Sequence, residues 1–147
     1  RVFGFSIFYE KECKTKHPIL PKMLQEDLAA VCDRLPLEAL PRLQRTNIYI
    51  NSSTSYGAID NPVEAKYATY HPSGSRQWLN EHGMNEKHEQ CIEIFDASQY
   101  LEDRFFWGTG GLLCHELSHA YHDKYVSKGY ENEEILRLER CSERRIV

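Results

Sequence analysis

The chain of 147 residues is long enough to bury the core of one ordinary domain. Hydrophobic residues make up 41% of it and charged residues 27%, a globular mixture that excludes wholesale disorder. The formal charge of -4 provides no basic surface for nucleic acid, and no apolar run approaches the length that crosses a bilayer.

The first third of the chain alternates strand and helix signals. Residues 2–9 are rich in aromatic and β-branched side chains and predict a strand. From Pro18 to Pro36 the apolar residues recur at spacings of four, four, three and four, which places them on one face of a helix. These residues are Leu20, Leu24, Leu28, Val31 and Leu35. Residues 37–43 predict a short second helix or turn, and the alternation in residues 46–51 predicts a half-buried strand.

The middle of the chain contains two further strand signals. Residues 52–62 have the composition of a loop, residues 66–71 predict a strand that ends at Pro72, and residues 90–95 predict the next strand. Between them, residues 75–82 predict a short helix that carries Trp78 and Leu79 inward and closes at Gly83. Asp96 or Ser98 is expected to cap a further turn of helix.

The last third of the chain is dominated by one helix. Glycines over 108–111 break the chain, and the apolar pattern then predicts a long helix from about residue 112 to residue 126. Residues 131–147 alternate acids and arginines and predict a polar tail or a marginal helix. The whole order indicates an α+β domain over residues 1–130, a small mixed sheet packed on helices.

The five cysteines indicate neither a disulfide framework nor a zinc ribbon. Their total is odd, no pair has the spacing CxxC, and small buried hydrophobic side chains are the preferred interpretation. They are Cys13, Cys32, Cys91, Cys114 and Cys141.

The last predicted helix carries the sequence HELSH at residues 115–119. Residues four apart on a helix lie about 6 Å apart on one face, so His115 and His119 can both direct an imidazole nitrogen at one zinc ion. Glu116 turns about 100° from His115 and stands beside the metal, where it can act as general base toward a zinc-activated water. A chance match to HExxH is expected in fewer than about one chain in a hundred of this size, and the surrounding apolar residues predict a buried helix.

A catalytic zinc takes three protein ligands, and the third is not evident from spacing. A continuous helix carries His122 about 4.5 Å along the axis beyond His119, which places it past an ion held by His115 and His119. We therefore expect His122 and Asp123 to orient an imidazole by bonding its other nitrogen. The upstream alternatives are His71, His82 and His88. A following segment offers Glu131, Glu133 and Glu134, which are better interpreted as a solvated acidic face.

Two further features have both a structural and a functional interpretation. The strand at residues 92–95 precedes the metal helix, and it is either an edge strand that pairs with substrate backbone or an ordinary core strand. Tyr121 and Tyr125 are near the ligands, and packing is the expected role of both.

The sequence HELSHAYHD at residues 115–123 resembles a widespread, mostly uncharacterised group of zincin metallopeptidases, distantly similar to the catalytic domain of anthrax lethal factor. Weaker similarities extend from about residue 35 to residue 136 and include His71-Pro72-Ser73 and Gly129-Tyr130. The resemblance implies a zincin-like α+β fold, His115 and His119 as ligands of Zn²⁺, Glu116 as general base, and a peptide or protein substrate. It also implies a third ligand, a glutamate on a later helix. The sequence ends at Val147, so we expect the domain to be C-terminally truncated and this ligand to be missing.

Three hypotheses follow from these observations. The first is a zinc metallopeptidase that hydrolyses peptide bonds through a zinc-activated water. The second is an inactive zincin-like binding module with weak or no zinc. The third is a zinc hydrolase of another amide class, such as a deformylase-like enzyme, and it ranks last because Cys91 lacks the glycine-rich context of the cysteine ligand in that class.

Overall fold

The computed structural model describes residues 1–52, 56–58, 61–63 and 68–134, and the side chains only outside residues 53–67. The strands are β1 (Ile7–Tyr9), β2 (Ile48–Ile50), β3 (Tyr56–Ala58), β4 (Asn61–Val63), β5 (Thr69–Tyr70) and β6 (Ile92–Ile94). The α-helices are α1 (Cys13–Lys16), α2 (Leu20–Arg34), α3 (Leu40–Leu43), α4 (Arg76–Glu81), α5 (Ala97–Trp107) and α6 (Gly111–Tyr125). Two 3-10 turns are η1 (Glu86–His88) and η2 (Gly129–Glu131). The chain is therefore an α+β domain, as the element order predicts.

The main sheet has the strand order β1-β2-β6-β5. The first three strands are parallel, and β5 is antiparallel to β6 at one edge. All three residues of β6 are buried, because β2 and β5 flank it and both faces of the sheet are covered there. Strand β6 is thus a core strand, and the alternative that it forms the edge is wrong. The two edges of this sheet are β1 and β5, and β5 is the edge strand next to β6.

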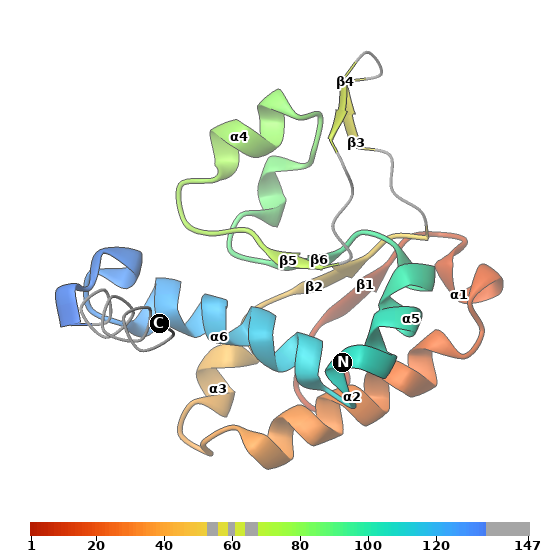
Figure 1. The fold of residues 1–147 in the computed structure, drawn as a ribbon, viewed down its shortest axis with the longest axis horizontal. Coiled ribbons are helices and arrows are strands. Elements are labelled where there is room, and N and C mark those ends of the chain that lie inside the picture. Colours follow the sequence, from red (N-terminus) through yellow and green to blue (C-terminus); the bar gives the residue numbers. More distant parts are fainter. Residues whose placement is uncertain (53–55, 59–60, 64–67, 135–147) are drawn as a thin grey trace, which may run out of the picture.

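Helices α2, α5 and α6 lie on one side of the sheet, and α4 lies on the other side with the β3–β4 hairpin (Figure 1). Helix α2 forms because its leucines repeat on one face, and its buried residues are Leu20, Leu24, Asp27, Leu28 and Val31. It ends before Pro36, which forces extended backbone on Leu35. Ile48, Ile50, Ile92 and Ile94 are buried in the same core cluster as this helix face.

A buried aspartate joins the three helices below the sheet. Asp27 on α2 is 1% exposed and accepts hydrogen bonds from the hydroxyl of Tyr100, from Nε of Arg104 and from the backbone N–H of Gly110. Burial and the neighbouring Asp27 carboxylate raise the pKa of Tyr100 well above its usual value. Asp27 therefore ties α2 both to α5 and to the residue from which α6 begins.

The start of α6 depends on glycine. Gly110 has a φ of 74°, a left-handed conformation, and a Cβ at this position would lie 2.7 Å from the carbonyl oxygen of Asp27. Helix α6 then runs for 15 residues and buries Leu112, Leu113, Glu116, Leu117 and Ala120. The glycine break and the helix that follows it agree with the sequence prediction.

Some local predictions are wrong. Strands β3 and β4 pair as a hairpin inside the segment predicted as a loop. Leu79 is buried as expected, but Trp78 is 42% exposed and stacks on His82 instead. Asp96 is the cap, accepting from the N–H groups of Ser98 and Gln99, and α5 continues for 11 residues rather than one turn.

The remaining predictions concern cysteines, membrane spans and the tail. Cys13 and Cys91 are buried, and Cys32 and Cys114 are partly buried against the core, which agrees with a packing role. Within the described segments, no helix combines the length and apolar character needed to span a bilayer. The predicted tail falls almost entirely on residues 135–147, which lie outside the described residues.

Candidate metal site

His115 and His119 meet on the exposed side of α6, one turn apart. Their Nε2 atoms are 3.1 Å apart, and the ring planes are almost perpendicular. Two nitrogens that each lie about 2.1 Å from a tetrahedral zinc ion are about 3.4 Å apart. The two imidazoles therefore fit one zinc ion with little movement, as the spacing predicts.

Both histidines line a cavity of about 420 Å³ between α6 and the edge strand. The lining residues are Ala68, Thr69, Tyr70, Pro72, His115, Glu116, His119 and Tyr130. His115 is exposed and His119 is half-buried, so a ligand can approach the imidazoles from solvent. The cavity thus has a histidine wall and a wall of extended backbone.

Glu116 is buried in this cavity and is held by the edge strand. It is 6% exposed, and its Oε2 accepts a hydrogen bond of 2.7 Å from the backbone N–H of Tyr70. Among the described residues β5 is the last strand of the sheet, so no neighbouring strand there accepts this N–H, which is available to the carboxylate. The edge strand therefore sets the orientation of Glu116.

Asp123 holds the same strand at a second point. Its Oδ2 accepts hydrogen bonds from the hydroxyl of Tyr70 at 2.8 Å and from the backbone N–H of Ser73 at 2.9 Å. Burial and the bond to Asp123 raise the pKa of Tyr70 above its usual value. Asp123 thus fixes the distance between β5 and α6, and the expectation that it orients an imidazole is wrong.

His122 also differs from its expected role. Its ring packs on that of Tyr130, with centroids 4.7 Å apart, and its Nε2 is buried with no hydrogen-bond partner in the described part of the chain. Tyr130 in turn donates from its hydroxyl to the carbonyl oxygen of His119 at 3.2 Å. Burial raises the pKa of Tyr130, and the nearby Asp123 and Glu116 raise it further. Tyr130 lines the cavity, and the sequence pattern alone did not assign it a role there.

No third protein ligand appears in the described segments. No group of three or more histidine, cysteine, aspartate or glutamate side chains is placed there to hold one metal ion. Glu131, Glu133 and Glu134 are exposed, and Glu133 pairs with Lys128 at 3.7 Å, as expected for a solvated acidic face. The described residues therefore bring together two imidazoles and one carboxylate.

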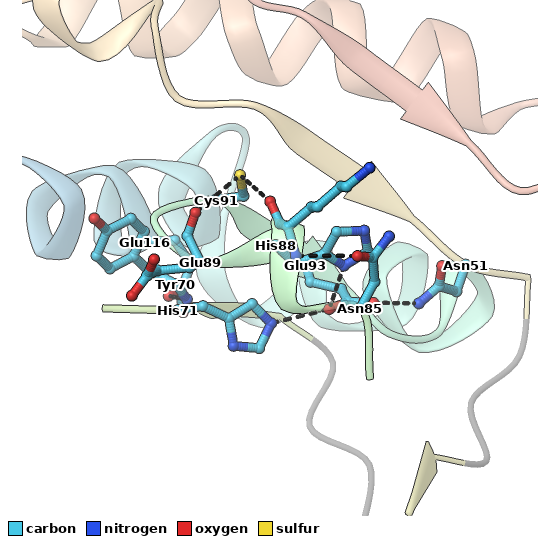
Figure 2. A network of polar contacts seen from close by, with 10 residues as sticks. Asn51, Tyr70, His71, Asn85, His88, Glu89, Cys91, Glu93 and Glu116 are labelled. Atoms are coloured by element: carbon cyan, nitrogen blue, oxygen red, sulfur yellow. Dashed lines mark hydrogen bonds and ion pairs between the residues drawn. The ribbon is translucent and has the colours of Figure 1, made fainter. Parts of the chain in front are cut away.

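The upstream histidines lie apart from this cavity. His71 and His88 both contact Oε2 of Glu93, at 2.9 and 3.1 Å, and Asn51 donates to Oε1 at 2.8 Å (Figure 2). Burial alone would raise the pKa of Glu93, but these three hydrogen bonds outweigh it and lower the pKa to about 2. His82 bonds the carbonyl oxygen of Trp78 through Nδ1.

The cluster around Glu93 connects β6 to the residues that follow β2 and β5 and to η1. Glu93 lies in the central strand, Asn51 directly follows β2, His71 directly follows β5, and His88 comes from η1. The ring of Tyr49 stacks on His88 with centroids 3.9 Å apart. The cluster therefore fastens both the edge strand and the segment that carries α4 to the sheet. Sequence reasoning did not identify Glu93, because a charged residue between two isoleucines of a strand is usually exposed.

Tyr121 and Tyr125 do not line the cavity. Tyr121 packs against the hydrophobic core, and the hydroxyl of Tyr125 donates to the carbonyl oxygen of Arg42 at 3.2 Å. Packing is therefore the role of both, as expected.

No protein-family model matches the sequence, and comparison with curated proteins and with solved structures finds no match. The chemistry of the cavity must accordingly be argued from its own residues.

Proposed function

We propose that this chain is a zinc-dependent metallopeptidase of zincin-like architecture. The observation that carries the proposal is the convergence of the His115 and His119 Nε2 atoms, 3.1 Å apart, in the cavity that also contains the carboxylate of Glu116. Two imidazoles at this separation suit zinc, because neutral imidazole is one of its preferred ligands. A carboxylate next to them is the group that metal-assisted hydrolysis requires as a base.

The roles of the side chains follow from their positions. His115 and His119 would hold the ion, and a bound zinc would polarise a carbonyl group and lower the pKa of water to roughly 7. Glu116 takes a proton from the attacking water and returns it to the nitrogen of the leaving amine. The hydrogen bond from the N–H of Tyr70 keeps Glu116 in place for both transfers.

The edge strand provides a place for the substrate. Thr69 and Tyr70 line the cavity, and β5 has a sheet neighbour on only one side. An extended peptide can lie along such an edge with its backbone between the strand and the two histidines. A peptide or protein chain is therefore the substrate class that this cavity favours.

A second candidate function has one observation in its favour. Within the described segments only two metal ligands are present, whereas a catalytic zinc site uses three. This ligand count favours a zincin-like binding module that holds zinc weakly or not at all. Zinc analysis separates the two candidates.

The test is metal content and stability of the purified chain. We expect about one zinc per chain by mass spectrometry, a rise in Tm on adding zinc and a fall on chelation. His115→Ala and His119→Ala should each abolish these effects, whereas His17→Ala, which does not alter the cavity, should retain them. Zinc well below stoichiometry together with an unchanged Tm would refute the peptidase for this chain.

Hydrolysis is tested with a quenched fluorogenic peptide library. Glu116→Gln should keep zinc and lower kcat by about 100-fold or more, because the amide cannot accept the proton. Retained turnover would show that another group is the base.

A further inference from the structure

Three consecutive aromatic residues at the end of α5 are exposed. Phe105 is 87% exposed, Phe106 83% and Trp107 43%, and we call these three residues the aromatic ridge. The rings of Phe105 and Phe106 contact each other edge to face, with centroids 5.7 Å apart. Burying such aromatic side chains is favourable, so the domain forgoes stabilisation by leaving them exposed. Clustered exposed aromatic residues mark interaction surfaces.

The buried face of α5 does not include the ridge. The buried face of α5 consists of Ala97, Tyr100 and Asp103, and three consecutive helical residues spread over about 200°, so the ridge extends well beyond that face. Helix α5 ends at Gly108, directly after the ridge. The aromatic rings are therefore presented outward from the last turn of the helix.

The ridge is continuous with the candidate metal site. The ring centroid of Trp107 lies 5.2 Å from that of His115, which lines the cavity. A Cβ at Gly111 would lie 3.3 Å from Cβ of Trp107, so the glycine at the start of α6 helps Trp107 to pack closely there. Trp107 thus places one end of the ridge against His115, and Phe106 and Phe105 directly precede it in the last turn of α5.

We propose that the aromatic ridge is a specificity subsite that binds an apolar side chain, of leucine or phenylalanine size, of the peptide substrate. The proposal rests on the proposed peptidase function and adds the class of peptide. A peptide along β5 passes the histidines, and the ridge lies beside His115 to receive one of its side chains. The chain carries a charge of -4, and exposed Glu102 adjoins the ridge, so an anionic membrane surface is disfavoured as occupant.

The test uses two fluorescein-labelled decapeptides that differ only at the centre, Leu-Phe in one and Ser-Asn in the other. Binding to zinc-loaded Glu116→Gln protein is measured by anisotropy, and cleavage by the unmodified chain is measured in parallel. The double variant F105Q/F106Q removes the ridge while keeping good helix formers. Leu37→Gln is the matched control, because Leu37 is 80% exposed and does not line the cavity.

We expect the Leu-Phe peptide to bind at least tenfold more tightly than the Ser-Asn peptide. F105Q/F106Q should abolish this preference and raise KM with kcat unchanged, whereas Leu37→Gln should alter neither. Equal affinity of the two peptides, or a preference that survives F105Q/F106Q, overturns the subsite. Ridge-dependent binding to phosphatidylcholine vesicles in place of the peptides also overturns it. Ridge-dependent peptide binding without any cleavage by the unmodified chain retains the subsite and refutes the peptidase.

Discussion

Replacing Glu93 with glutamine tests whether the buried carboxylate stabilises the fold through its hydrogen bonds with His71, His88 and Asn51. Its pKa is lowered from 4.5 to about 2, and each pKa unit corresponds to about 1.4 kcal/mol, so ionised Glu93 stabilises the fold by about 3 kcal/mol. A carboxylate with a lowered folded-state pKa contributes this stability above pH 4.5 and loses it as the pH falls toward 2. By pH 3 about 2 kcal/mol of it should be gone.

The assay is urea unfolding between pH 7 and pH 3, with chelator present so that metal binding does not contribute. Glu93→Gln should lower the free energy of unfolding at pH 7 by about 2–3 kcal/mol and should remove this part of the acid sensitivity. Glu38→Gln serves as control, because Glu38 is exposed. If the unmodified chain and Glu93→Gln lose the same stability between pH 7 and pH 3, the carboxylate does not act as described.

Three further substitutions test the supports of α6 and β5. Gly110→Ala should destabilise the fold by about 2 kcal/mol or more, because it combines a positive φ with a Cβ 2.7 Å from a backbone oxygen. Calorimetry measures the loss, and an unchanged Tm would contradict the close approach. Asp27→Asn should cost about 3 kcal/mol in chemical denaturation, since Arg104 then loses its buried carboxylate and keeps only the ion pair with the exposed Glu26. A loss below about 0.5 kcal/mol would show that the buried pair contributes little. Tyr70→Phe should lower the free energy of unfolding by about 1–2 kcal/mol, because it removes the hydroxyl that binds Asp123. It should also accelerate hydrogen exchange at the amide of residue 70, which donates to Glu116. Unchanged exchange would show that the hydroxyl does not anchor β5.

Asp123 and Glu93 act on the two sides of the same short strand. Asp123 binds the hydroxyl of Tyr70 from α6, and Glu93 binds His71 from the central strand. The N–H of Tyr70, which lies between these two anchors, orients the carboxylate of Glu116. A strand of two residues is marginal alone, so these side-chain bonds keep β5 in position next to α6.

Several elements are largely local properties, and the sequence predicts them, although it does not predict the β3–β4 hairpin or the full length of α5. The leucine repeat predicts α2, the isoleucine alternation predicts β2, and Gly110 precedes the helix that places His115 and His119 one turn apart. The pairing of these two imidazoles depends only on the helical period. The sequence by itself therefore predicts that these two histidines lie side by side.

The partners of these elements were decided only by the tertiary structure. Periodicity indicates which face of a strand is buried but not its order in the sheet, so β5 rather than β6 is the edge strand above Glu116. The bonds of Asp27, Glu93 and Asp123 join residues far apart in the chain, and no local pattern encodes them. The exposure of Phe105 and Phe106 likewise follows from which face of α5 packs on the core, because aromatic composition by itself favours burial.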